Sequence, residues 1–346
     1  MRTSVLTIRA HHGLSCPDKT RRMRMLASKH RLEPIPVGSL QAVGPGINRP
    51  ETTLGTRSAQ IYSSTDDAAV AIVNAAGAVS RVGKSVCSNG IAMDLQGRIL
   101  IANFSLDTDR PGPLQRLDLA SGEVEDLVTE IDGRRLVASN FVVVARDGTI
   151  YCTHSSWGPS VASCVKPHIA DGFVYRVSPD GAVSVVATGL AGANGCCLDA
   201  EQRYLYVAQT GRGRIVRFLR NADGSLGQAE PYGPQLGDIP LVESADDLFA
   251  LPPEQKSRLG HPDNIAFDAD GNLWIALPVA NKIVAITPAG ELVTVIDDPE
   301  CTKVIAPTSI AWGGPDLMDV YIGSLGTPHV LMARSPVPGM PLCHQA

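Results

Sequence analysis

Polar side chains open short apolar runs at six places along the chain. They are Glu51, Asn89, Asn140, Asn194, Asp263 and Thr308. Together they offer two carboxylates, three amide oxygens and one hydroxyl, with no His or Cys among them. Hard oxygen ligands of this kind suit Ca²⁺ or Mg²⁺ rather than structural zinc, and Ca²⁺ accepts amide oxygens and variable geometry more readily. Two acids close together would repel each other, and a divalent cation would cancel both charges.

Taken singly, an Asn or Asp at the start of a strand often only satisfies the backbone of a turn. The shared register of these residues favours a common site. Four anchors are followed ten residues later by a second apolar run, which starts at Ile61, Ile99, Ile150 or Leu273. In five of the six units a third run follows and ends near a Gly turn, which is a signal for β-hairpins.

The spacing of the anchors predicts the architecture. Successive anchors are 38, 51, 54, 69 and 45 residues apart. Periods of about 40–50 residues with about four strands per unit are typical of a β-propeller. We therefore predict an all-β fold, a six-bladed β-propeller with about four antiparallel strands per blade; a β-sandwich would not repeat one polar anchor six times. The first strand of each blade lines the central channel, so the anchors should converge at one mouth.

Composition supports one folded domain with a short leader. Charged residues make up 19% and hydrophobic residues 44%, which excludes a disordered chain. Residues 1–32 carry +7 of the net charge of −5, so the remainder carries −12. We predict a flexible basic extension over residues 1–40 and the propeller over residues 41–346. The acidic body argues against a nucleic-acid partner.

Targeting signals are weak in this chain. The leader has no apolar stretch of the kind that secretory signals need, so a transit peptide or a mis-started N-terminus are the two interpretations, and we favour the second. The longest uncharged run, residues 181–198, contains four Gly and an Asn, which argues against a membrane span. The eight cysteines lack zinc spacing and are typical of reduced core thiols. These features predict a cytoplasmic protein with no membrane partner.

Four segments carry a family resemblance. They are RPE (Arg49–Glu51), SNFVVVARDGTIYCT (Ser139–Thr153), ANGCCLDAEQRYLYVAQTGRGRIVRF (Ala193–Phe218) and HPDNIAFDADGNLWIAL (His261–Leu277). Over about residues 45–335 the chain resembles the senescence-marker-protein/gluconolactonase/regucalcin-like family of six-bladed propellers. The resemblance implies a calcium-dependent hydrolase that opens a lactone or cleaves a related ester, with a small-molecule substrate. Mg²⁺, Mn²⁺ or Zn²⁺ are alternative cations, and the sequence leaves the oligomeric state open.

The same resemblance implies roles for particular residues. The metal ligands would be Glu51, Asn140, Asn194 and Asp263, with Asp263 also the general base or nucleophile. The family pattern often places an Arg two residues before the middle Asn to hold a sugar acid. This chain has Ala138 there, which puts a sugar-acid lactone in doubt.

Other residues have weaker claims. The PDN segment is also similar to strictosidine-synthase-like propellers, which makes Asn264 a further ligand candidate. Asn89 and Thr308 are expected to line the channel. His154 is either a substrate contact or, the interpretation that we favour, a surface loop residue. Two alternative functions stay open, a condensing or lyase propeller of the strictosidine-synthase type and a non-catalytic ligand-binding propeller. The longest interval, residues 219–260, forms either a lid or a side excursion.

Overall fold

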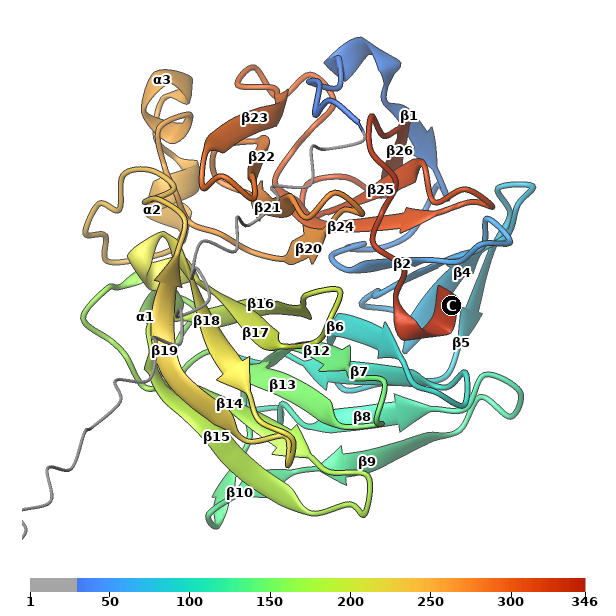
Figure 1. Ribbon diagram of the computed structural model, residues 1–346, viewed down its shortest axis with the longest axis vertical. Coiled ribbons are helices and arrows are strands. Elements are labelled where there is room, and N and C mark those ends of the chain that lie inside the picture. Colours follow the sequence, from blue (N-terminus) through green and yellow to red (C-terminus); the bar gives the residue numbers. More distant parts are fainter. Residues whose placement is uncertain (1–29, 346) are drawn as a thin grey trace, which may run out of the picture.

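The recurring apolar runs form six four-stranded antiparallel sheets in the computed structural model, which describes residues 30–345 (Figure 1). Counted outward from the channel, the first blade contains β2 (Thr53–Gly55), β3 (Ile61–Ser63), β4 (Val70–Val73) and β5 (Val79–Val82). The second contains β6 (Ser88–Met93), β7 (Ile99–Asn103), β8 (Leu114–Leu117) and β9 (Val124–Val128). The third contains β12 (Ser139–Val144), β13 (Ile150–His154), β14 (Gly172–Val177) and β15 (Val183–Leu190). The predicted six-bladed propeller is thereby confirmed.

The remaining blades complete the ring. The fourth contains β16 (Ala193–Leu198), β17 (Tyr204–Gln209), β18 (Arg214–Arg220) and β19 (Leu226–Tyr232). The fifth contains β20 (Ile265–Phe267), β21 (Leu273–Leu277), β22 (Lys282–Ile286) and β23 (Leu292–Asp297). The sixth contains β24 (Pro307–Gly313), β25 (Asp319–Ser324), β26 (Val330–Arg334) and, outermost, β1 (Gln41–Val43). The sixth blade therefore joins the two ends of the described chain.

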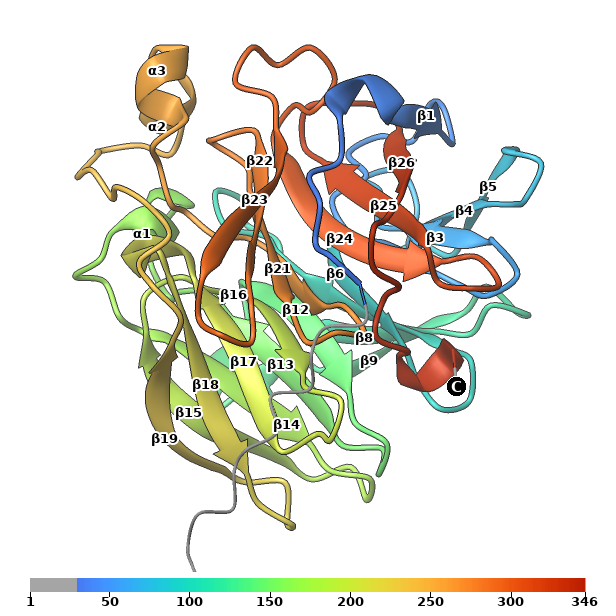
Figure 2. The ribbon, with the colours of Figure 1, turned by 45° about the horizontal axis from the view of Figure 1, so that its top comes forward.

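The six first strands touch their neighbours in a closed circle. β2 contacts β6, and contacts continue through β12, β16, β20 and β24 back to β2. Figures 1 and 2 show these strands nearest the common centre, with the outer strands splayed away from it. The anchors lie at or just before the start of these inner strands. Because all six strands run in the same sense along the channel, the anchors meet at one end.

Asx turns fix the constant interval between first and second strands. The Oδ1 atom of Asp94 accepts hydrogen bonds from the backbone N–H groups of Gln96 and Arg98, both at 2.9 Å. Asp268 does the same for Asp270 and Asn272, at 3.0 and 2.9 Å. An Asp side chain that bonds its own downstream backbone closes a tight hairpin. The core then forms between blades from β-branched and aromatic side chains, which fit a pleated surface.

Few regular elements of residues 30–345 lie outside the six blades. They are the hairpin β10 (Glu130–Ile131) and β11 (Arg134–Arg135), and the short helices η1 (Val37–Ser39), α1 (Ala162–Val165), η2 (Thr210–Arg212), α2 (Asp246–Phe249), α3 (Pro253–Lys256) and η3 (Cys343–Gln345). Among residues 30–345, none of the helices has the length and apolar character needed to cross a membrane.

The chain ends pack against the ring. Ile35 and Leu40 are buried in the core of blades five and six, and the Ile35 N–H donates to the Val295 carbonyl at 2.8 Å. The predicted flexible extension, residues 1–40, therefore does not describe residues 30–40, because their apolar side chains find a place in the core. Residues 1–29 lie outside the described residues, and the extension stays a prediction for them. At the other end, residues 340–345 line the far end of the channel, and the side chain of Gln345 donates to the carbonyls of Gly55 and Trp312, both at 2.8 Å.

Candidate functional site

A cavity of about 270 Å³ lies at the mouth where the anchors meet. Four predicted metal ligands line it: Glu51, Asn140, Asn194 and Asp263. They come from four different blades and from positions up to about two hundred residues apart in the chain. The fold thus brings together the set of oxygen atoms that the sequence predicted to converge.

The two carboxylates of this cavity are buried, which disfavours their charged forms. Burial raises the pKa of Asp263 well above its usual range, and the negative charge of Glu51 raises it further. Burial also raises the pKa of Glu51, while the positive charge of Arg49 opposes the rise. Two acids that share a desolvated site cannot both ionise without a compensating cation. The electrostatics of the mouth therefore favour a bound positive charge.

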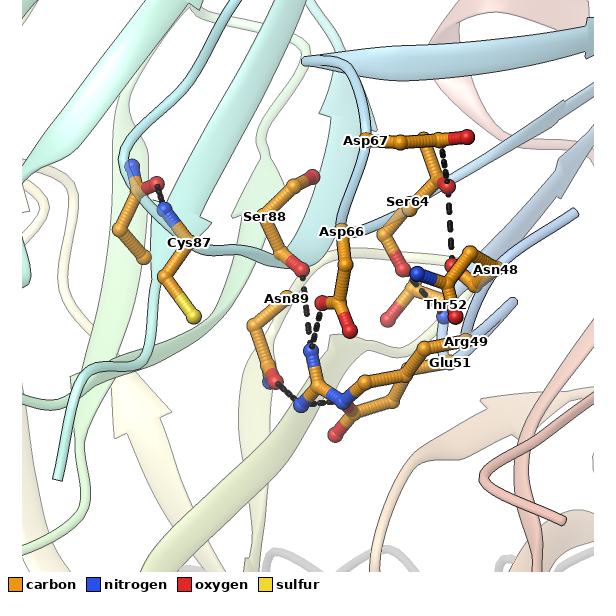
Figure 3. Close-up of polar contacts among 12 residues, drawn as sticks. Asn48, Arg49, Glu51, Thr52, Ser64, Asp66, Asp67, Cys87, Ser88 and Asn89 are labelled. Carbon is orange, nitrogen blue, oxygen red and sulfur yellow. Dashed lines mark hydrogen bonds and ion pairs between the residues drawn. The ribbon is translucent and has the colours of Figure 1, made fainter. Parts of the chain in front are cut away.

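Arg49 supplies one positive charge beside Glu51 (Figure 3). Its guanidinium pairs with the Glu51 carboxylate, donates to Asn89 Oδ1 at 3.0 Å and reaches Asp66 at 3.3 Å. Its backbone adopts the left-handed conformation (φ 56°), which is uncommon outside Gly and is retained where surrounding contacts enforce it. Arg49 belongs to the RPE segment, but its type and spacing did not mark it as a site residue.

Amide groups complete the polar floor of the cavity. The Asn194 Nδ2 donates to Thr210 Oγ1 at 3.2 Å, whereas its Oδ1 is buried and has no hydrogen-bond partner. Asn89 Nδ2 donates to the Asn140 carbonyl at 3.2 Å and to its Oδ1 at 3.4 Å. A buried acceptor without a partner costs free energy unless a ligand satisfies it. Among residues 30–345 no three His, Cys, Asp or Glu side chains form a cluster, so any cation here depends on amide oxygens as well as on the two acids.

The other predicted channel residues support this floor. Thr308 is buried and its hydroxyl donates to the Glu51 carbonyl at 2.6 Å, so it positions Glu51 through the backbone. Asn264 is buried farther down the channel, where its Oδ1 also has no hydrogen-bond partner. The Asn89 side chain accepts a hydrogen bond from Arg49 and donates one to the Asn140 carbonyl. Thr308, Asn264 and Asn89 are adjacent to the proposed ligands, but none of them lines the mouth cavity itself.

His154 does not line the mouth cavity. Its ring is fully buried, stacks on Phe173 with centroids 4.6 Å apart and lies 4.2 Å from the Trp157 ring. The Ala138 N–H donates to its Nε2 at 3.2 Å, so Nδ1 carries the proton of the neutral ring. Neither the substrate contact nor the surface loop residue is confirmed, because His154 is the last residue of β13 and its buried ring points into an aromatic cluster rather than into the mouth cavity.

Replacing His154 with Gln should reduce the loss of stability in acid. Burial lowers the pKa of His154 from 6.5 to about 3. Between these values the unfolded chain binds the proton and the folded protein does not, so stability falls as the pH falls below about 6.5. His154 should account for about 2 kcal/mol of the unfolding free energy lost between pH 7 and pH 5. Urea titrations at both pH values, on wild type and His154→Gln, isolate this difference.

The matched control is His168→Gln, because His168 is exposed. It should lose as much stability as the wild type between the two pH values. An unchanged acid loss in His154→Gln would show that His154 is not the group that titrates.

The long interval between the fourth and fifth anchors divides into two parts. Its first part forms β19, the outer strand of blade four, and so belongs to neither of the two predicted alternatives. Its second part carries α2 and α3 and lies over the cavity, where Ala245, Leu248 and Phe249 form part of the wall. Leu248 is fully buried against Val165 and Val279, so this segment is packed onto the rim. Of the two alternatives, the structure places it as a cover.

His261 is a further residue of the cavity wall. It is buried, and neither ring nitrogen has a hydrogen-bond partner. Burial lowers its pKa to about 4, which keeps the ring neutral at pH 7. It lies two residues before Asp263 and lines the same cavity.

A match to a family model decides the family. The model described as SMP-30/Gluconolactonase/LRE-like region matches residues 111–326, more than half of the chain. This protein belongs to that family. The SMP-30/gluconolactonase match covers Asn140, Asn194 and Asp263, and Glu51 lies before it.

Individual members of the SMP-30/gluconolactonase family are distant. The gluconolactonase of Zymomonas mobilis is 24% identical over 211 residues, which cover 60% of this chain and 54% of that protein. A solved gluconolactonase from Xanthomonas campestris superposes with a TM-score of 0.65 at 22% identity, covering 86% of this chain and 89% of the other. A calcium-binding regucalcin from Agrobacterium tumefaciens has a TM-score of 0.60 at 15% identity, covering 86% and 92%. The chain spans about half the length of the curated relatives it matches.

Proposed function

We propose that this protein hydrolyses a lactone, or a related ester, at a divalent cation held in the mouth of the propeller. The convergence of Glu51, Asn140, Asn194 and Asp263 on one cavity, with a buried Asn194 oxygen that lacks a partner, is the observation that carries the proposal. The family membership supports it, since several relatives are named as lactonases. The small-molecule substrate follows from the same relatives.

The donor set fits a hard cation, with Ca²⁺ preferred and Mg²⁺, Mn²⁺ or Zn²⁺ as alternatives. Two carboxylates and two amide oxygens match the ligands that Ca²⁺ takes in proteins. Burial raises the pKa of both Glu51 and Asp263, even with Arg49 beside Glu51, and a bound cation would stabilise their charged forms. A solved regucalcin relative is described as calcium-binding. When bound, such a cation would polarise the substrate carbonyl and stabilise the negative charge that develops on its oxygen.

Asp263 is the proposed general base. It removes a proton from the water molecule that attacks the carbonyl carbon of the substrate. The C–O bond of the ring then breaks, and the departing oxygen takes the proton back from Asp263 to give a hydroxy acid. Direct attack by the Asp263 carboxylate is the alternative, followed by hydrolysis of the resulting acyl group. The buried setting of Asp263 and its contact with Asn194 hold the carboxylate in place for either step.

Removing the cation should abolish turnover. Protein stripped with a chelator should open no lactone faster than buffer does, and added Ca²⁺ should restore the rate. Calcium at a hundred times its dissociation constant should also raise the free energy of unfolding by about 2.7 kcal/mol, because it binds only the folded state. A panel of lactones, esters and phosphotriesters, assayed with and without Ca²⁺, measures the first effect, and thermal unfolding measures the second.

The same panel of substrates distinguishes the proposed hydrolase from the two alternative functions. Full activity after chelation would refute the role of the cation. Calcium binding without turnover of any substrate would instead favour the non-catalytic propeller, and a condensing propeller of the strictosidine-synthase type would open no lactone in either condition.

A further inference from the structure

Several side chains that line the mouth cavity are apolar. Phe104 follows the second strand of blade two, Val161 precedes α1, and Leu325 follows the second strand of blade six. The covering segment adds Leu248 and Phe249 from α2. A ligand whose carbonyl rests on the floor would therefore meet hydrocarbon on several sides.

The hydroxyl groups in this wall are already engaged. Ser155 Oγ donates to the Ala193 carbonyl at 2.7 Å, and Thr210 Oγ1 donates to the Pro262 carbonyl at the same distance. Sugar hydroxyls buried against such a wall would lose hydrogen bonds to water without regaining them, which costs free energy for each group. The apolar part of the wall is therefore poorly suited to a polyhydroxylated ring, and the polar groups left to receive substrate hydroxyls are those of the floor and His261.

The position of the missing arginine points the same way. Ala138, which stands where the family pattern often has an Arg, is fully buried in an apolar cluster with Leu106 and Cys164. Phe104 and Val161 pack against this cluster and also line the cavity. An apolar cluster without a cationic side chain thus lies behind this part of the cavity wall.

The rim carries exposed apolar side chains. Phe249 is 41% exposed and Leu325 is 42% exposed, and both line the cavity. Large apolar side chains left open beside a cavity commonly mark a surface that contacts a ligand. Their place at the opening suits the end of an alkyl chain that extends outward from the floor.

We infer that the substrate is a lactone or ester with an apolar alkyl substituent rather than a sugar lactone, and that Phe249 is a specificity-determining residue for that substituent. This inference rests on the proposed function for the reactive group and goes beyond it for the rest of the substrate. The polar floor receives the ester group, and the apolar wall with its cover receives the hydrocarbon. Phe249 acts through contact with the alkyl chain and takes no part in the chemistry.

Chain length is the variable that tests the inference. We expect kcat/KM for γ-lactones to rise about threefold for each methylene added between a methyl and a pentyl substituent, because each methylene leaves water for the apolar wall. Glucono-δ-lactone should be a much poorer substrate than the pentyl lactone. Binding of the matching 5-alkyl pyrrolidinones, lactams that resist hydrolysis under the assay conditions, should tighten by the same factor in calorimetry.

Variants of the covering segment test whether Phe249 causes the dependence on chain length. Phe249→Ser should reduce the gain per methylene in both measurements, and Phe249→Leu should retain most of it. Leu241→Ser is the matched control, since Leu241 lies in the same segment, is 74% exposed and does not line the cavity. It should keep the wild-type dependence on chain length.

The outcomes separate the inference from the proposed function. A chain-length dependence in lactam binding without turnover of any lactone would support the apolar site and refute hydrolysis. Efficient opening of glucono-δ-lactone with no chain-length dependence in either measurement would overturn the inference and leave the hydrolase standing. Equal responses of Phe249→Ser and Leu241→Ser would overturn the role of Phe249.

Discussion

Replacing Asp263 with Asn should leave a folded protein whose lactone-opening rate is lower by about a thousandfold, the usual scale for loss of a general base. An Asn side chain has nearly the same shape but cannot accept the proton of the attacking water. Burial and Glu51 already disfavour the ionised form of Asp263. Removal of its charge should therefore not lower the free energy of unfolding of the cation-free protein.

The measurements must separate catalysis from cation binding, because Asp263 is also a proposed ligand. Rates should be taken at saturating Ca²⁺, with the calcium affinity of the variant determined by calorimetry. Asp297→Asn, an exposed carboxylate of the same blade, is the control and should keep the wild-type rate. Retention of activity in Asp263→Asn at saturating Ca²⁺ would remove Asp263 from the catalytic role.

A methyl group added at Gly195 should damage both stability and activity. A Cβ atom there would lie 2.5 Å from the Asn264 Cα and 2.6 Å from the Asp263 carbonyl oxygen, so the inner strands of blades four and five would have to separate. Overpacking of this kind typically costs about 1–3 kcal/mol of unfolding free energy. Because the displaced backbone carries Asp263, we expect kcat to fall by about a hundredfold, the scale set by a 1 Å error in catalytic geometry.

Gly227→Ala is the matched control within blade four. Gly227 lies in the outer strand β19, and an added Cβ would meet nothing closer than 3.5 Å. This variant should keep its activity and lose no stability, since replacing Gly by Ala at an unstrained site lowers the entropy of the unfolded chain. Equal unfolding free energies for the two variants would show that the inner strands can part without cost.

The propeller was predictable from the sequence because one local pattern recurs. The second strands of four blades begin at Ile61, Ile99, Ile150 and Leu273, the positions that the ten-residue interval predicts. Asx turns such as that of Asp268 enforce this interval locally. Strand periodicity and turn chemistry act over a few residues, and the closed ring follows from repeating them.

The convergence of the anchors was predictable for a related reason, but their partners were not. Equivalent positions in a ring of blades must approach the axis, so Glu51 and Asp263 meet although a long stretch of sequence separates them. That Arg49 turns its guanidinium onto Glu51 depends on a left-handed backbone at a non-glycine residue. Nothing in residue type or spacing predicts that conformation. His154 shows the opposite failure, because its aromatic partners come from a different strand and a loop.

The sequence does not decide whether the segment with α2 and α3 is a lid or a side excursion, and the reason is physical. Its path is set by the burial of Leu248 among side chains of two different blades, and by the 3.1 Å hydrogen bond from Lys282 to the Ser257 carbonyl. Such contacts depend on the finished ring. Periodicity in the segment itself carries no information about them.

The sixth blade also sets an order of events in folding. β1, near the start of the described chain, pairs with β26, near its end, and Gln345 bonds to Gly55 from 290 positions away. Closing so long a loop is a slow step, and it must wait until the last blade has been synthesised. Five blades can form one after another as the chain emerges, each with its neighbours still incomplete. Until the sixth closes, Glu51 has no Thr308 behind it, so the candidate site is assembled last.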